Sequence, residues 1–105
     1  MYITEQDVTM VVRSALIRVA KCIKLKDFDL KSNLEIYDEI RNSETDLIYP
    51  LNTFINSYIE WYMFHKIKEH NSIISQEDKS KLSGLISNRD RSREQLIEIL
   101  SQKGC

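Results

Sequence analysis

The chain of 105 residues has only two glycines and one proline. Tight turns depend on these two residue types, so their scarcity argues against a sheet-rich fold. The scarcity also argues against a disordered linker, since 42% of the residues are apolar. No apolar run approaches the roughly 20 residues that cross a bilayer, and the first residues lack the order of a signal peptide. We therefore expect one all-helical domain over residues 1–105, located in the cytosol and away from membranes.

Cysteine is also scarce, with Cys22 inside an apolar helical pattern and Cys105 as the last residue. Two cysteines at this separation do not form a disulfide framework or a metal-binding motif. Within a helical pattern, cysteine usually serves as a small core residue. We therefore predict that both side chains are free thiols.

What the sequence does contain is an aromatic segment at residues 46–70, which holds six of the nine aromatic side chains. Its apolar residues recur at helical spacing, which predicts a helix at the centre of the bundle. Beyond Tyr62 the apolar side changes, so we expect different neighbours at the two ends and a buried Trp61 between them. The residues on the first apolar side are Leu51, Phe54, Ile55, Tyr58 and Tyr62, and those on the second are Met63, Phe64 and Ile67.

Helix-capping signals place the other helices around this segment. Thr4 can cap a helix that ends near Lys24, and Ser32 begins a capping box for a short helix that ends near Asn42. In that short helix Leu34, Ile36, Tyr37 and Ile40 are available for packing, and in the connection before it we expect Phe28 and Leu30 to reach the core. Asp46 can cap the central helix, which places Pro50 in its first turn, where the missing N–H costs no hydrogen bond. Ser75 can cap a final helix.

The final segment allows two interpretations, because residues 87–95 contain no apolar side chain. As one helix, it keeps a core-facing pattern that includes Arg89 and Arg93. As two helices, it breaks at residues 87–92, and Ser92 caps the second piece. We favour one long helix with an exposed middle, which gives four helices in all; the alternative gives five.

No motif for catalysis or cofactor binding is present. His65 and Glu69 lie one helical turn apart and His70 follows, but no second cluster completes the three or four ligands that zinc requires. Glu60 could act as a general base only with a partner motif, and none is found. We expect no enzyme activity, no metal and no cofactor.

Charge is distributed unevenly, although the total is only −1. Residues 1–26 carry a net charge of +3, whereas residues 27–46 contain seven acidic and two basic residues, a net of −5. An acidic segment leading into an aromatic helix suits a basic protein partner, because charge accelerates encounter and aromatic side chains provide lasting contact. The expected contact residues are Glu35, Asp38, Glu39, Asp46 and Tyr49.

The run Asp46-Leu47-Ile48-Tyr49-Pro50 resembles the DLIYYP segment of the small helical immunity proteins that neutralise nuclease bacteriocins. In that family the segment is a short third helix whose tyrosines enter the toxin, and an acidic second helix provides specificity. The resemblance implies that Asp46 and Tyr49 contact a partner, with the acidic residues at 35, 38 and 39 matching as charges. This chain lacks the second tyrosine and continues into a much longer helix. The resemblance and the acidic segment together lead us to expect a cytosolic inhibitor of a basic protein, similar to an immunity protein or antitoxin.

A basic trio supports an alternative function. Arg89, Arg91 and Arg93 could contact phosphates in a small phage or bacterial nucleic-acid-binding regulator. However, Asp90 and Glu94 are interleaved with the arginines, as expected for a solvated helix face. We therefore expect nucleic-acid binding to be no more than non-specific.

Overall fold

In the computed structural model, residues 5–69 and 75–105 are described, and they form four α-helices and no strand. The helices are α1 (Glu5–Cys22), α2 (Asn33–Asn42), α3 (Ile48–Glu69) and α4 (Gln76–Gln102), with a short 3-10 turn, η1 (Phe28–Leu30), before α2. The prediction of an all-helical chain with four helices is confirmed. Residues 76–102 form a single helix, so the one-helix interpretation of the last segment is also confirmed. Its middle is not wholly exposed as predicted, because Ser92 is buried and Arg89 is partly buried.

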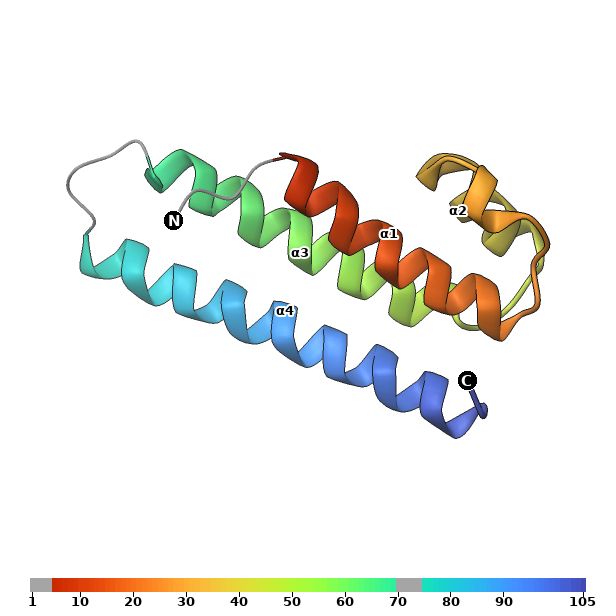
Figure 1. Ribbon diagram of the computed structural model, residues 1–105. Coiled ribbons are helices and arrows are strands. Elements are labelled where there is room, and N and C mark those ends of the chain that lie inside the picture. The colour runs from red at the N-terminus through yellow and green to blue at the C-terminus, as the bar shows by residue number, and fades with distance from the viewer. Residues whose placement is uncertain (1–4, 70–74) are drawn as a thin grey trace.

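The helix α3 packs against both α1 and α4, and α2 packs on the outer side of α1 (Figure 1). Both α1 and α4 run antiparallel to α3, so their C-terminal ends lie at the same end of the molecule (Figure 1). The 27 residues of α4 span about 40 Å, since each residue of an α-helix adds about 1.5 Å. This length explains the elongated shape, with extents of 48 × 27 × 20 Å.

The capping signals at Ser32 and Ser75 are confirmed. The Ser32 hydroxyl accepts the Glu35 backbone N–H, and the Glu35 carboxylate accepts the Ser32 N–H, which completes the predicted capping box. The Ser75 hydroxyl accepts the Asp78 N–H at the start of α4. The predicted cap at Thr4 lies outside the described residues.

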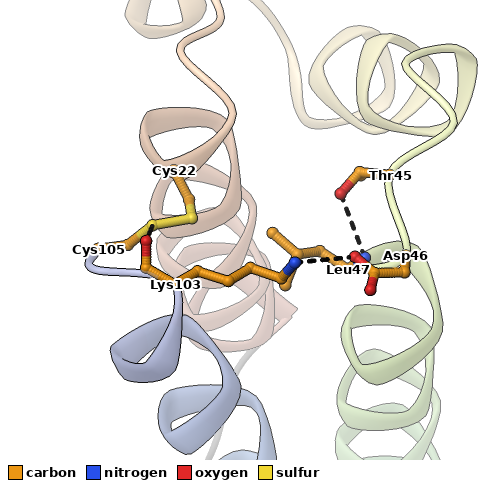
Figure 2. The surroundings of a disulfide bond; sticks show 6 residues. All are labelled: Cys22, Thr45, Asp46, Leu47, Lys103 and Cys105. Atoms are coloured by element: carbon orange, nitrogen blue, oxygen red, sulfur yellow. Dashed lines mark hydrogen bonds and ion pairs between the residues drawn. A yellow bond between two sulfur atoms is a disulfide. The ribbon is translucent and has the colours of Figure 1, made fainter.

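The start of α3 differs from the prediction at Asp46. The helix begins two residues later, at Ile48, and the Thr45 hydroxyl accepts the Leu47 N–H instead. The Asp46 carboxylate pairs with Lys103 of the C-terminal segment, 3.2 Å away (Figure 2), so it is not the N-cap. Pro50 lies in the first turn as predicted.

The C-terminal ends of α1 and α4 have the same backbone geometry. Lys24 follows α1 with a positive φ of 61°, and the Leu25 N–H bonds to the Ala20 carbonyl. Gly104 follows α4 with a φ of 79°, and the Cys105 N–H bonds to the Leu100 carbonyl. These 6→1 bonds satisfy carbonyls that a helix end leaves free. They turn the chain back at each helix end. The helix α1 ends at Cys22, two residues before the predicted end near Lys24.

The prediction of two free thiols is wrong, because Cys22 and Cys105 form a disulfide (Figure 2). Cys22 is the last residue of α1, and the turn at Gly104 brings Cys105 beside it, with the two Cα atoms 5.2 Å apart. The bond closes a sequence separation of 83 residues. Sequence reasoning missed it because it depends on α1 and α4 ending together, which is a tertiary property.

Apolar side chains from all four helices form two clusters. The larger one lies among α1, α2, α3 and the C-terminal half of α4, and the smaller one is formed by Trp61, Tyr62 and Leu85. Trp61 is only 6% exposed, as predicted. The larger cluster contains Ala15, Leu16, Val19, Ala20, Ile36, Ile40, Leu47, Leu51, Phe54, Leu96 and Leu100.

Some expected core residues are on the surface. Leu30 and Leu34 are 83% and 70% exposed, whereas Ile36 and Ile40 of α2 are fully buried, as predicted. Met63 and Ile67 are also exposed. The second apolar side of α3 was predicted to have a neighbour, but the described residues leave these two side chains uncovered. Phe64 is half-buried, with the ammonium groups of Lys68 and Lys81 near its ring.

The polar middle of α4 contacts α3 through small and charged side chains. Ser92 is buried, and its hydroxyl lies 3.0 Å from that of Ser57 on α3. The Arg89 guanidinium lies over the Trp61 ring, 4.4 Å from its centroid. A continuous helix therefore packs here without apolar residues, because serine allows close approach and arginine stacks on an aromatic face.

We expect Trp61→Ala to lower the free energy of unfolding by about 3–5 kcal/mol, because it empties a large core site. Urea denaturation followed by circular dichroism measures the change. Met63→Ala on the exposed side of the same helix is the matched control and should cost less than about 1 kcal/mol. Similar losses for both variants would contradict the packing described here.

The pair between Lys68 of α3 and Asp78 of α4 should make stability depend on pH. Its 3.1 Å contact includes a hydrogen bond that lowers the pKa of the Asp78 carboxyl. The folded pKa is then below the unfolded value of about 3.9, so the stabilisation is present above that value and is lost as pH falls through the folded pKa. Asp78→Asn should be less stable than wild type at pH 7, and the gap should close on acidification. Urea denaturation across this range measures the gap, and a constant gap would refute the assignment.

Candidate functional site

A groove runs along the surface between α1 and α4, with α3 beneath it. One part of it has a volume of about 490 Å³ near the middle of α4, and an adjoining part of about 660 Å³ lies at the disulfide end. Arg18 and Ile97 line both parts, so we treat them as one feature, the α1/α4 groove. Its existence follows from the packing, because α1 and α4 both rest on α3.

The floor of the α1/α4 groove is apolar. Phe54 and Tyr58 of α3 lie beneath the middle part, while Leu96 and Leu100 of α4 belong to the core cluster that continues below. Phe54 is buried, but Ile97 is partly exposed and presents its side chain to the groove. The apolar lining residues are Val11, Ala15, Phe54, Tyr58, Leu96, Ile97 and Leu100.

The rim is strongly basic. Six cationic side chains line the groove, and Asp90 is the one acidic side chain among the lining residues. Asp90 pairs with Arg89 at 3.0 Å, and Lys103 pairs with Asp46. Among the described residues, no ion pair joins the other four cations, so most of the positive charge remains available to a ligand. The six are Arg18, Lys21, Lys24, Arg89, Arg93 and Lys103.

Tyr58 adds a hydrogen-bonding group to the floor. Burial raises the pKa of its hydroxyl, and nearby Arg89 opposes that shift only in part. The hydroxyl therefore keeps its proton at neutral pH and can donate a hydrogen bond to an anion. Guanidinium, ammonium and phenol groups together suit a carboxylate or phosphate, and they do not by themselves provide a nucleophile or a general base.

The structure separates the predicted basic trio. Arg89 and Arg93 lie one turn apart on α4 and both line the groove, whereas Arg91 lies between them in sequence and is exposed outside the lining. The trio is therefore not one surface, since residues two apart do not share a helix face. Sequence reasoning noted the positive charge of residues 1–26, but it could not place Arg18 and Lys21 beside α4.

The predicted acidic residues are largely engaged within the chain. Glu39 pairs with Lys31 at 2.6 Å, Asp38 pairs with Arg41 at 3.3 Å, and Asp46 pairs with Lys103. Glu35 takes part in the capping box. Three of these residues lie on α2 and the fourth just before α3, so two separate elements supply the acidic surface.

Tyr49 is the most accessible of the predicted contact residues, at 73% exposed. It lies in the first turn of α3, directly before Pro50, and the Thr53 hydroxyl bonds to its backbone carbonyl. The expectation of an accessible tyrosine at this position agrees with the structure. Whether a partner binds there is not tested by its exposure.

Other chemistry considered from the sequence has little geometric support. In the described ranges, no group of three or more His, Cys, Asp or Glu residues is arranged to hold a metal ion. His70 lies outside those ranges, His65 lies against Trp61, and Glu60 is exposed. None of the helices described is both long enough and apolar enough to cross a membrane.

Comparison of the chain with family models, curated proteins and solved structures gives no match. The resemblance of residues 46–50 to the immunity proteins therefore stays a prediction.

Proposed function

We propose that the protein acts by binding another protein, and that its α1/α4 groove takes an acidic amphipathic helix from that partner. The observation that carries this proposal is the lining of the groove, with six cationic side chains and one acidic side chain around an apolar floor. An amphipathic helix matches both features at once, because its apolar stripe can meet the floor and its acidic flanks can meet the rim. The basic partner predicted from the sequence would have the opposite charge to this acidic helix.

The length of the groove supports a helix as the ligand. Along α1 the lining extends from Val11 to Lys24, and along α4 from Arg89 to Lys103. Each span corresponds to about 20 Å of helix. A ligand helix of about 14 residues, or four turns, would therefore contact the groove along its whole length.

Nucleic acid fits the groove less well. Phosphates could meet the rim, but single-strand binding also relies on bases stacking on exposed aromatic rings. Phe54 is buried in the floor and Trp61 is covered by Arg89, so these rings offer no open stacking surface. The acidic residues of α2 and the net charge of −1 also disfavour a polyanion as long as DNA or RNA.

Charge reversal in the groove tests the proposal. The probe is a labelled peptide of about 14 residues with leucines at i, i+3, i+4 and i+7 and glutamates elsewhere. Fluorescence anisotropy should show about ten-fold or greater loss of affinity for the Arg18→Glu/Arg93→Glu double variant, because two rim charges become repulsive. Arg91→Glu is the control for charge outside the groove and should change affinity less than about two-fold.

Two outcomes would count against this function. If Arg91→Glu lost as much affinity per substitution as the double variant, the peptide would respond only to the overall charge of the protein. Tighter binding of an oligonucleotide than of the peptide at physiological salt, abolished by the double variant, would favour the nucleic-acid alternative. Circular dichroism of each variant excludes loss of fold as the cause.

A second candidate is the inhibitor of a basic protein, similar to an immunity protein or antitoxin. The exposure of Tyr49 in the first turn of α3 favours it. A tyrosine beside a proline loses little conformational freedom on docking and offers both ring area and a hydroxyl. Asp38 and Glu39 would provide charge around Tyr49. The Asp38–Arg41 pair is exposed and weak enough to be exchanged, whereas the 2.6 Å Glu39–Lys31 pair is partly buried.

For a basic partner isolated by pull-down, we expect Tyr49→Ala to increase the dissociation rate and to cost about 2 kcal/mol or more of binding free energy. Tyr49→Phe keeps the ring and should lose less. Neutralising Glu35, Asp38 and Glu39 should mainly slow association and reduce its dependence on salt. Surface plasmon resonance separates these rates, and unchanged kinetics in both sets of variants would remove Tyr49 and α2 from the interface.

A further inference from the structure

The disulfide lies in the lining of the groove. Cys22 and Cys105 line its basic end, together with Lys21, Lys24 and Lys103. The bond joins the last residue of α1 to the chain end that follows α4, and these are the two helices that form the groove walls. It is therefore a covalent link between the walls at one end of the binding surface.

Residues 103–105 tie three helices together, and we name them the C-terminal clasp. Cys105 holds α1 through the disulfide, and Lys103 reaches Asp46 just before α3 (Figure 2). Gly104 between them provides the left-handed turn that precedes Cys105. All three residues are exposed. Backbone hydrogen bonds hold the clasp to the end of α4, while the disulfide joins it to α1 and one surface ion pair joins it to Asp46.

The surroundings of the disulfide favour thiol exchange. Cys105 is an exposed residue that lines the groove, so we expect an attacking thiolate to approach its sulfur from the groove side. Lysine side chains in the same hollow stabilise the thiolate that leaves when the bond opens. In the cytosol, where the sequence leads us to expect the protein, a disulfide is usually transient and regulatory.

We propose that the Cys22–Cys105 disulfide is a redox switch for the α1/α4 groove, which is competent to bind when the bond is closed and weakened when it is open. The inference rests on the proposed binding function of that groove. A dithiol reductant opens the bond in two steps: its thiolate attacks the Cys105 sulfur and releases the Cys22 thiolate, and its second thiol then displaces Cys105. The chain gains two electrons and two protons, and the reductant becomes a disulfide.

Opening should weaken binding for two physical reasons. The groove walls lose their covalent link at the basic end, so a ligand must itself restore their spacing, which lowers affinity. Release of the clasp also lets Lys103 move away from the rim and reduces the charge that an acidic helix meets. The effect should be greatest at the disulfide end, because α1 and α4 remain packed on α3 elsewhere.

The first arm of the test measures the switch without a ligand. The full chain is treated with dithiothreitol, and free thiols are counted by alkylation and mass spectrometry while circular dichroism monitors the fold. We expect both thiols to become reactive with the helical signal retained, and hydrogen exchange to accelerate over residues 97–102 but not over residues 76–85. A bond that opens only when the chain unfolds would overturn the proposal.

The second arm measures binding of the acidic amphipathic peptide in both redox states. We expect about ten-fold weaker binding to the reduced chain, with full recovery on reoxidation. Cys105→Ser should bind as weakly as the reduced chain and should not respond to dithiothreitol, which controls for direct effects of the reductant. Equal affinity in the oxidised and reduced states would refute the switch.

The two arms distinguish this inference from the proposed function. If the peptide binds the oxidised chain and Arg18→Glu/Arg93→Glu abolishes binding, but redox state has no effect, the groove function stands and the switch fails. If the peptide binds neither redox state, the groove function fails and control of it by the disulfide fails with it. The thiol and hydrogen-exchange measurements then report only whether the clasp opens in the folded chain.

Discussion

The burial of α3 side chains against α1 on one side and α4 on another is the interaction on which the rest of the structure depends. Leu51 and Phe54 are almost fully buried in the larger cluster, and Trp61 joins α3 to α4 in the smaller one. Because α1 and α4 both pack on the same helix in the same direction, they end side by side and leave a groove between them. The disulfide and the basic rim are consequences of that arrangement, and neither is encoded by a local motif.

Charge is sorted by this arrangement in a way that the total of −1 conceals. The acidic residues of α2 and the α3 start lie near basic residues that pair with them, such as Glu39 with Lys31. Basic side chains outnumber acidic side chains in the lining of the groove. A positive electrostatic potential therefore extends into the space above the floor. Exposed pairs each contribute only about 0–1 kcal/mol to stability, so this sorting has more influence on which ligands approach than on folding.

Sequence reasoning was most accurate where a local interaction decides the structure, although the cap at Asp46 was wrong, and least accurate where packing decides it, although the burial of Trp61 was right. The Ser32 and Ser75 caps and the position of Pro50 follow from hydrogen bonds within one turn, so residue type and spacing identified them. The end of α1 was missed because Lys24, and not glycine, adopts the left-handed conformation. The groove and the disulfide required knowledge of which helices lie together, and the sequence of a single chain does not provide it.

The ion pair between Asp46 and Lys103 links the two candidate surfaces. Asp46 belongs to the acidic surface that includes Tyr49, and Lys103 belongs to the rim of the α1/α4 groove. If the proposed ligands bind, an acidic ligand in the groove would compete with Asp46 for Lys103, and a basic partner at α3 would compete with Lys103 for Asp46. The Asp46 side chain is 75% exposed, so breaking the pair costs little. A ligand that binds one surface would therefore free the charged residue of the other, Asp46 or Lys103, from the pair. The two surfaces are electrostatically coupled in this way although different helices form them.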